Sequence, residues 1–206
     1  MTPAQEALDR LKEGNRDFVS DVRADVTLTS SARRSELAEE GQNPFAIILG
    51  CADSRVPSEM VFGQGVGDLF VIRVAGNIVD PSQLGSVEFA AEHFGTRLVV
   101  VMGHSKCGAI LATFEELRNP AKNPSPNLST IVNHIRPSVE PLIGSGESED
   151  ELVEKAVRAN INASVEQLRS ESEILDHLVR EDGLLIIGAE YSLETGAVDF
   201  FDALPE

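Results

Sequence analysis

The sequence has no tryptophan, a single tyrosine and only two cysteines among its 206 residues. Basic residues are also scarce, with 17 lysines and arginines against 34 acidic residues, so the formal net charge is −17. Such an acidic surface repels phosphate backbones and anionic lipids, which disfavours nucleic acid and membrane surfaces as partners. No apolar run approaches the roughly 18 residues that a membrane-spanning helix requires. The sequence therefore argues against nucleic-acid-binding and membrane proteins.

The N-terminus shows no basic stretch followed by an apolar segment, so we expect no signal peptide and a cytoplasmic location. Cys51 and Cys107 are the two cysteines. A disulfide between them is disfavoured in a reducing compartment, where thiols more often serve as ligands or catalysts. Two buried, inert thiols are the remaining alternative. The residues around each cysteine must decide between these interpretations.

The length and the 42% hydrophobic content fit one α/β domain with a sizeable core. We expect a single domain over residues 1–206, with an N-terminal helical arm at 1–40 and an α/β core at 41–206. Leu8, Leu11 and Phe18 recur at helical spacing in the arm. We expect the arm's two helices to pack outside the main domain or against a partner subunit.

The core alternates short apolar runs with helical patterns. Runs that end in glycine are typical of strands buried on both faces. The predicted strands cover residues 45–49, 69–72, 98–102 and 184–188, with a short edge strand at 197–200; the predicted helices cover 82–94, 108–117, 128–143 and 149–180, the last interrupted near Ser170. This alternation predicts an α/β fold: a mainly parallel sheet of about four strands plus a short edge strand, with helices on both faces.

Both cysteines follow predicted strands. Cys51 comes after the first strand, and His104 and Cys107 come after the third. Parallel α/β sheets bind ligands at the carboxyl ends of their strands, so the two loops converge if these strands are neighbours. Two thiolates and an imidazole suit Zn²⁺, and three protein ligands leave a fourth position open, as in catalytic zinc sites. A core histidine beside two buried thiols is the alternative.

An acid and an arginine lie two residues apart beside the first cysteine. Asp53 and Arg55 can form a charge-assisted pair. Asp53 could then accept a hydrogen bond from zinc-bound water, or it could occupy the fourth zinc position itself. A simple loop salt bridge, which contributes little on a surface, is the other interpretation.

These segments resemble a known family. Residues 51–57 (CADSRVP) and 103–108 (GHSKCG), with 73–77 (RVAGN) between them, are similar to the signature segments of bacterial-type β-class carbonic anhydrases. The similarity extends from about residue 8 to residue 200. The resemblance implies reversible hydration of CO2 to bicarbonate and a proton by zinc-bound hydroxide. The zinc ligands would be Cys51, His104 and Cys107. Asp53 and Arg55 would form a catalytic dyad that controls the fourth zinc position, with Asp53 as an exchangeable fourth ligand.

The resemblance also implies a substrate pocket. Gln42 matches a glutamine that hydrogen-bonds substrate or anion, and Gly108 follows the last ligand as the family pattern requires. Phe70, Ala75 and Phe89 match positions that line a narrow apolar pocket, with Phe89 expected from the neighbouring subunit. Ordinary core packing is the alternative for those three. The resemblance implies a homodimer or a dimer of dimers, with the active site at the interface.

One departure from the family pattern concerns regulation. Some bacterial members carry a non-catalytic bicarbonate site made of a tryptophan, an arginine and a tyrosine. Here Ile48 stands at the tryptophan position, whereas Arg73 and Tyr191 match the other two. We therefore expect weak or absent inhibition through that site.

Other functions fit the sequence less well. The glycines at 63–67 precede a strand and are too closely spaced for a dinucleotide-binding loop. Residues 103–107 resemble a nucleophile elbow, but Cys107 stands where glycine is required. An interaction protein with a permanently four-coordinate zinc would have no need of Arg55. A hydrolase that acts on a related substrate such as carbon disulfide, with the same fold and zinc, stays open.

Overall fold

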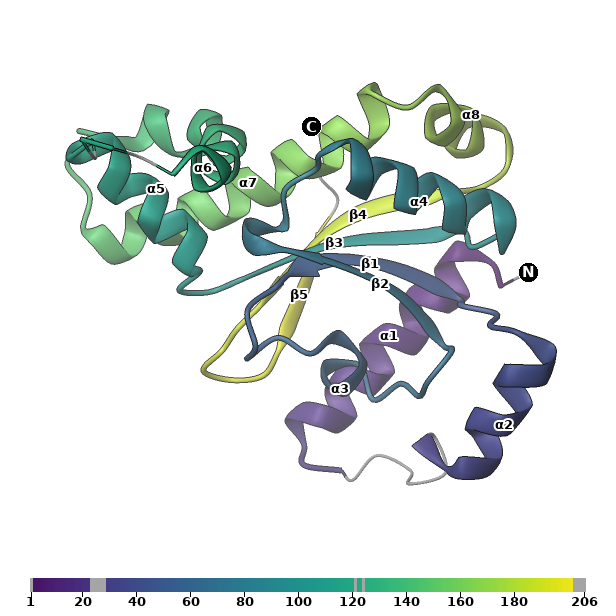
Figure 1. The fold of residues 1–206 in the computed structure, drawn as a ribbon. Helices are drawn as coiled ribbons and strands as arrows, with labels where there is room; N and C mark the ends of the chain where they lie inside the picture. The colour runs from purple at the N-terminus through teal and green to yellow at the C-terminus, as the bar shows by residue number, and fades with distance from the viewer. Residues whose placement is uncertain (1, 23–28, 121, 124, 202–206) are drawn as a thin grey trace.

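A five-stranded sheet forms the centre of the protein (Figure 1). The computed structural model describes residues 2–22, 29–120, 122–123 and 125–201. The strands lie in the order β2-β1-β3-β4-β5, where β1 to β4 are parallel and β5 is antiparallel to β4. Their bounds are β1 (Ala46–Cys51), β2 (Leu69–Val74), β3 (Leu98–His104), β4 (Leu185–Tyr191) and β5 (Val198–Phe201). The predicted α/β fold with four parallel strands and an edge strand is confirmed.

Helices cover both faces of the sheet (Figure 1). On one face lie α4 (Pro81–His93), α7 (Glu149–Ser170) and α8 (Glu173–Glu181), with α5 (Gly108–Arg118) and α6 (Pro126–Val139) packed beside α7. On the other face lie α1 (Ala4–Val19) and the short α3 (Ser58–Val61). Two single-turn helices, η2 (Ala75–Asn77) and η3 (Glu140–Leu142), follow β2 and α6, and α2 (Ser31–Glu40) lies at the periphery.

The apolar runs of the sequence become strands because both faces of the sheet are covered. In β1, Ile47 and Leu49 pack into the core beneath α4 and α7, whereas Ala46 and Ile48 pack into the core beneath α1. Successive residues of a strand point to opposite faces, so a strand buried on both sides needs apolar residues at successive positions.

The two N-terminal helices differ in how they pack. Ala7, Leu8 and Leu11 of α1 are buried against the sheet of the same chain, so α1 belongs to the core instead of lying outside the domain. Asn15 fixes its position, because its Nδ2 donates to the Gly196 carbonyl at 2.9 Å and its Oδ1 accepts from the backbone of the β5 strand. No residue of α2 is buried, so of the two N-terminal helices only α2 lies outside the core, as expected for an arm.

Close packing of α7 depends on a glycine in β3. A Cβ atom at Gly103 would lie 2.7 Å from Cδ1 of Ile161 in α7, closer than real side chains approach. Because Gly103 has no side chain, α7 can pack directly against the carboxyl end of β3, next to the residues that follow this strand. The predicted interruption near Ser170 is present, because α7 ends there and α8 begins at Glu173.

No helix within the described residues has both the length and the apolar character needed to cross a membrane.

Candidate active site

The two neighbouring strands β1 and β3 end in potential metal ligands. The chain runs from β1 to β2 on one side and then returns to β3 on the other side, so the strand order reverses between β1 and β3. Such reversal points open a crevice at the carboxyl ends of the strands. Cys51 is the last residue of β1 and His104 the last of β3. With Cys107 they form a buried group whose Sγ atoms and a ring nitrogen lie within 4.8 Å of one another.

The loop that carries His104 and Cys107 is held by its neighbours. Lys106 has a φ of 55°, which turns the chain sharply, so that Cys107 becomes the N-cap of α5. The Ser105 amide donates to the Tyr191 carbonyl at 3.0 Å, and the Ser105 hydroxyl accepts from the Leu193 amide at 3.0 Å. The end of β4 and the residues after it therefore fix the position of this loop.

The ring of His104 is oriented for metal binding. Its Nδ1 lies 2.9 Å from the Ser105 carbonyl, to which it donates when it carries the proton, and this leaves the Nε2 lone pair free. Nε2 is buried and has no hydrogen-bond partner among the described residues. Buried polar atoms are rarely left unpaired, and an imidazole held by one nitrogen with the other bare is typical of a metal ligand. Two thiols and this nitrogen are a donor set that zinc fits.

Protonation of the donors is coupled. The pKa of the Cys51 thiol is lowered to about 4, chiefly because Cys107 donates a hydrogen bond to its thiolate. The pKa of Cys107 is raised by that same bond and by burial. Burial lowers the pKa of His104, but the Cys51 thiolate, the Ser105 carbonyl and Asp53 outweigh burial and raise it overall. Without a metal, therefore, the site retains protons that a cation would displace.

Asp53 lies beside the three donors and is paired with Arg55. Nε of Arg55 donates to Oδ1 at 2.9 Å and Nη2 donates to Oδ2 at 2.7 Å, while the Arg55 amide also donates to Oδ1 at 2.9 Å. These bonds hold the pKa of Asp53 well below its usual range. Oδ2 is 3.8 Å from Nε2 of His104. A fully ionised carboxylate thus lies next to the metal donors while Arg55 holds it.

Arg73 supports the same loop from β2. Its Nε donates to the Cys51 carbonyl at 3.0 Å and its Nη2 to the Asp53 carbonyl at 2.5 Å. The sequence suggested only that Arg73 matches one member of a bicarbonate site. The hydrogen bonds of Arg73 to backbone carbonyls depend on the fold, and no sequence motif indicates them.

Two of the residues assigned to the substrate pocket lie near the donors. Ala75 begins η2, whose next residue, Gly76, donates its amide to Sγ of Cys51 at 3.4 Å. Gly108 is the first residue of α5, directly after Cys107, and apart from its chain neighbours and its own helix backbone no described heavy atom lies within 4 Å of where its Cβ would be. Space is therefore left open beside the ligand loop.

The other three lie away from the donors within one chain. Gln42 is exposed and precedes the amino end of β1, whereas Cys51 ends that strand. Phe70 pairs with Ile47, four positions before Cys51, which corresponds to roughly 13 Å along the strand. The ring of Phe89 lies 6.2 Å from that of Phe70 and is half exposed. The roles of these three residues stay predictions, and for Phe89 the prediction involves the neighbouring subunit.

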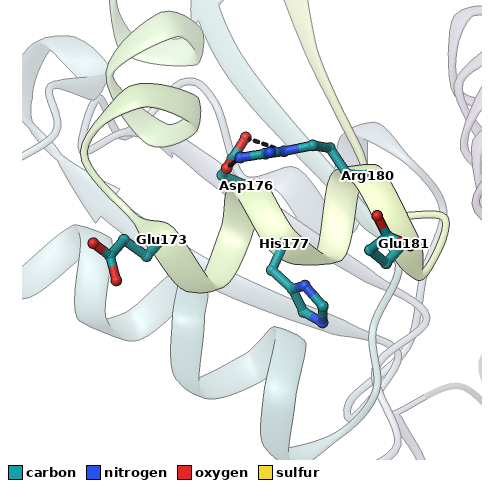
Figure 2. A pocket seen from close by; sticks show the side chains of 5 residues that line it. All are labelled: Glu173, Asp176, His177, Arg180 and Glu181. Carbon is teal, nitrogen blue, oxygen red and sulfur yellow. Dashed lines mark hydrogen bonds and ion pairs between the residues drawn. The ribbon is translucent and has the colours of Figure 1, made fainter.

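The remaining histidines lie elsewhere. His93 stacks on Phe89 with ring centroids 5.0 Å apart, and Nε2 of His134 lies 3.8 Å from Asp80. His177 lies on the outer face of α8 in a shallow hollow (Figure 2). The hollow is lined by residues of that helix alone: Glu173, Asp176, His177, Arg180 and Glu181.

Comparison with known proteins agrees with this geometry. The family model for carbonic anhydrase matches residues 46–198, which contain all three donors and the Asp53–Arg55 pair. Carbonic anhydrase 2 of Mycobacterium tuberculosis is 37% identical over 186 residues, covering 90% of this chain and 87% of that protein. The carbonic anhydrase of Mycolicibacterium smegmatis is 36% identical over 191 residues, covering 92% and 89%.

A solved structure shares the fold. The β-carbonic anhydrase CafA of Aspergillus fumigatus matches with a TM-score of 0.75 and 27% identity, covering 85% of each chain. Sequence motifs, sheet order and donor set thus lead to one assignment. The chain belongs to the carbonic anhydrase family, as a zinc-dependent lyase of the β class and the bacterial type.

Proposed function

We propose that this protein catalyses the reversible hydration of CO2 to bicarbonate and a proton, with zinc on Cys51, His104 and Cys107 and with Asp53 and Arg55 as its catalytic dyad. The observation that carries the proposal is the bare, buried Nε2 of His104. A ring nitrogen of His104 lies within 4.8 Å of two thiol sulfurs, and the carboxylate held by Arg55 is 3.8 Å from Nε2. A closed structural zinc would not need a carboxylate held back in this way.

Zinc held by Cys51, His104 and Cys107 would supply a Lewis acid that makes hydroxide available near neutral pH. Two thiolates donate more negative charge to the metal than two imidazoles would. We therefore expect a preference for mildly alkaline conditions.

The dyad orients the nucleophile. Because Asp53 stays ionised, its carboxylate can accept a hydrogen bond from the attacking hydroxide and direct the oxygen lone pair toward CO2. Arg55 holds Asp53 in this role and keeps it from occupying the fourth zinc position itself. Rotation of Asp53 away from Arg55 would give a closed, inactive form.

A second copy completes the substrate pocket. Gln42, Phe70 and Phe89 lie outside the donor cluster of one chain, and Phe89 exposes half of its surface beside other aromatic rings. In a homodimer or a dimer of dimers they would face the partner's zinc, Gln42 to position an oxygen and the rings, with Ala75, to exclude water. Gly108 leaves room for the substrate beside the ligand loop. We place the enzyme in the cytoplasm, as the sequence indicates.

The decisive experiment measures zinc content and CO2 hydration on one preparation from roughly pH 6 to 9. We expect about one zinc per chain and a rate that rises with pH. A Cys107→Ser variant should bind zinc more weakly and lose most of the activity. Zinc-loaded protein that is inactive throughout would overturn the proposal. Turnover of carbon disulfide by such protein would then identify a sister hydrolase, and the absence of both activities an interaction protein.

A further inference from the structure

The turn η2 places a backbone donor against one of the zinc ligands. The Gly76 amide donates to Sγ of Cys51 at 3.4 Å, and both atoms are buried. The turn has positive φ at two successive residues, 74° at Gly76 and 44° at Asn77. Glycine adopts a positive φ freely, and asparagine does so more readily than most other residues, so the sequence of the turn suits its shape.

Two side chains of α7 hold this turn. Nδ2 of Asn160 donates to the Gly76 carbonyl at 2.8 Å, and Oγ of Ser164 donates to the Asn77 carbonyl at 3.0 Å. Asn160 is 2% exposed and Ser164 4% exposed. The two residues are four apart, so they lie on the same face of the helix.

That face of α7 is otherwise apolar. Val157, Ile161 and Val165, which interleave with the two polar residues, all belong to the main core. Burying an amide or a hydroxyl in such surroundings is unfavourable unless it is hydrogen-bonded. The hydrogen bonds to the carbonyls of η2 therefore explain why two polar side chains, Asn160 and Ser164, lie in this buried face.

We propose that Asn160, assisted by Ser164, is a positioning residue that aims the Gly76 amide at Cys51 Sγ and so limits the negative charge that this thiolate gives to the metal. A hydrogen bond to a ligand sulfur withdraws electron density from it, and such outer contacts tune a metal's properties. Asn160 is not one of the three metal donors, and it acts through the turn. The inference rests on the zinc site of the proposed function, and it does not depend on the substrate being CO2.

The test uses cobalt-substituted full-length protein, because the absorption band of sulfur-to-cobalt charge transfer reports the electron density on the thiolates without any assay of activity. In Asn160→Leu the donor to Gly76 is lost at similar volume, and we expect the band to move to longer wavelength. Ser164→Ala should move it less, in the same direction.

Leu168→Ala is the matched control. Leu168 is buried on the same face of α7, one turn beyond Ser164, so its truncation loosens the helix without removing a contact to η2. We expect an unmoved band in this variant. If Asn160→Leu fails to fold, Ser164→Ala and Asn160→Asp, which keeps the shape but cannot donate when ionised, serve in its place.

An unmoved band in the folded Asn160 and Ser164 variants, or an equal shift in Leu168→Ala, would overturn the proposal. Failure of the proposed function is a separate result. It would appear as an absence of CO2 hydration in the zinc-loaded wild-type protein, whatever the cobalt band of the variants shows.

Discussion

Arg55 holds the carboxylate of Asp53 by two side-chain hydrogen bonds, one to each oxygen, at 2.9 and 2.7 Å. The side chain of Arg55 is 54% exposed, and ion pairs so open to solvent contribute little to folding stability. Oδ2 of Asp53 lies only 3.8 Å from the bare Nε2 of His104. This distance supports the proposed role of the pair, in which Arg55 keeps the Asp53 carboxylate out of the fourth zinc position.

Replacement of Arg55 by alanine should consequently lower CO2 hydration by about 10² or more, the range typical of lost acid–base groups. The released carboxylate is free to take the fourth zinc position, so zinc should be retained and the melting temperature should change little. Stopped-flow hydration and metal analysis on one sample provide the measurement. Arg55→Lys, which keeps the charge but not the two-pronged geometry, should lose less activity. Near-normal hydration by Arg55→Ala would remove the dyad from the mechanism.

Zinc affinity should increase with pH. The pKa values of His104 and Cys107 are raised in the metal-free site, so these groups keep their protons to higher pH, whereas Cys51 loses its proton near pH 4. Zinc needs unprotonated donors, so its binding near neutral pH must release protons and weaken on acidification.

Competition with a chromogenic chelator at several pH values, together with a pH indicator in weak buffer, measures both effects. The Cys107→Ser variant, which lacks one proton-bearing donor, should release fewer protons and bind more weakly. Zinc affinity that is independent of pH in the wild-type protein would contradict this account.

The strands and the metal donors were predictable because one physical pattern determines both. Strands covered on both faces need continuous apolar runs, and in a parallel sheet the residues after such runs meet at one edge. Cys51 and His104 end β1 and β3, which are neighbours, as the prediction required.

Other parts of the site leave no local signal. The contacts of Asn160 with η2 join residues 84 positions apart, and those of Arg73 with the Cys51 loop join residues 22 apart. Hydrogen bonds of this kind depend on how α7 packs against the sheet and on which strand β2 pairs with. No spacing rule in the sequence predicts them. The packing of α1 on its own sheet was missed for a related reason. An amphipathic stripe shows that a helix buries one face, but it does not show against what.

A substitution at Phe89 can test whether the active site needs a second copy of the chain. Phe89 is 50% exposed and its ring meets that of Phe94 at 5.6 Å, so a partner could cover it. A buried, unpaired charge costs several kcal/mol. Phe89→Asp should therefore shift the mass measured by analytical ultracentrifugation toward that of the monomer and reduce CO2 hydration in parallel. Leu128→Asp, at a residue of α6 that is 56% exposed, is the control that should change neither. A dimeric, fully active Phe89→Asp protein would assign Phe89 to ordinary surface packing.

Two glycines should respond in opposite directions to the same substitution. A methyl group at Gly103 would lie 2.7 Å from both Cδ1 and Cγ1 of Ile161, so Gly103→Ala should cost about 1–3 kcal/mol of unfolding free energy, as overpacking does. Apart from its chain neighbours and the backbone of α4, Gly85 has no described heavy atom within 4 Å of its Cβ position. Gly85→Ala should therefore stabilise the protein by about 0.5–1 kcal/mol. Urea unfolding of the zinc-loaded proteins measures both changes.

A second-site substitution identifies the cause of the Gly103 effect. Ile161→Ala removes both of the clashing atoms, so its cost and that of Gly103→Ala should be clearly less than additive when the two are combined. Strictly additive costs would show that Gly103 is required for another reason. Because His104 follows Gly103 directly, the single Gly103→Ala variant should also bind zinc more weakly, and the double variant should recover part of that affinity. This recovery would connect the close packing of α7 on β3 to the geometry of the metal donors.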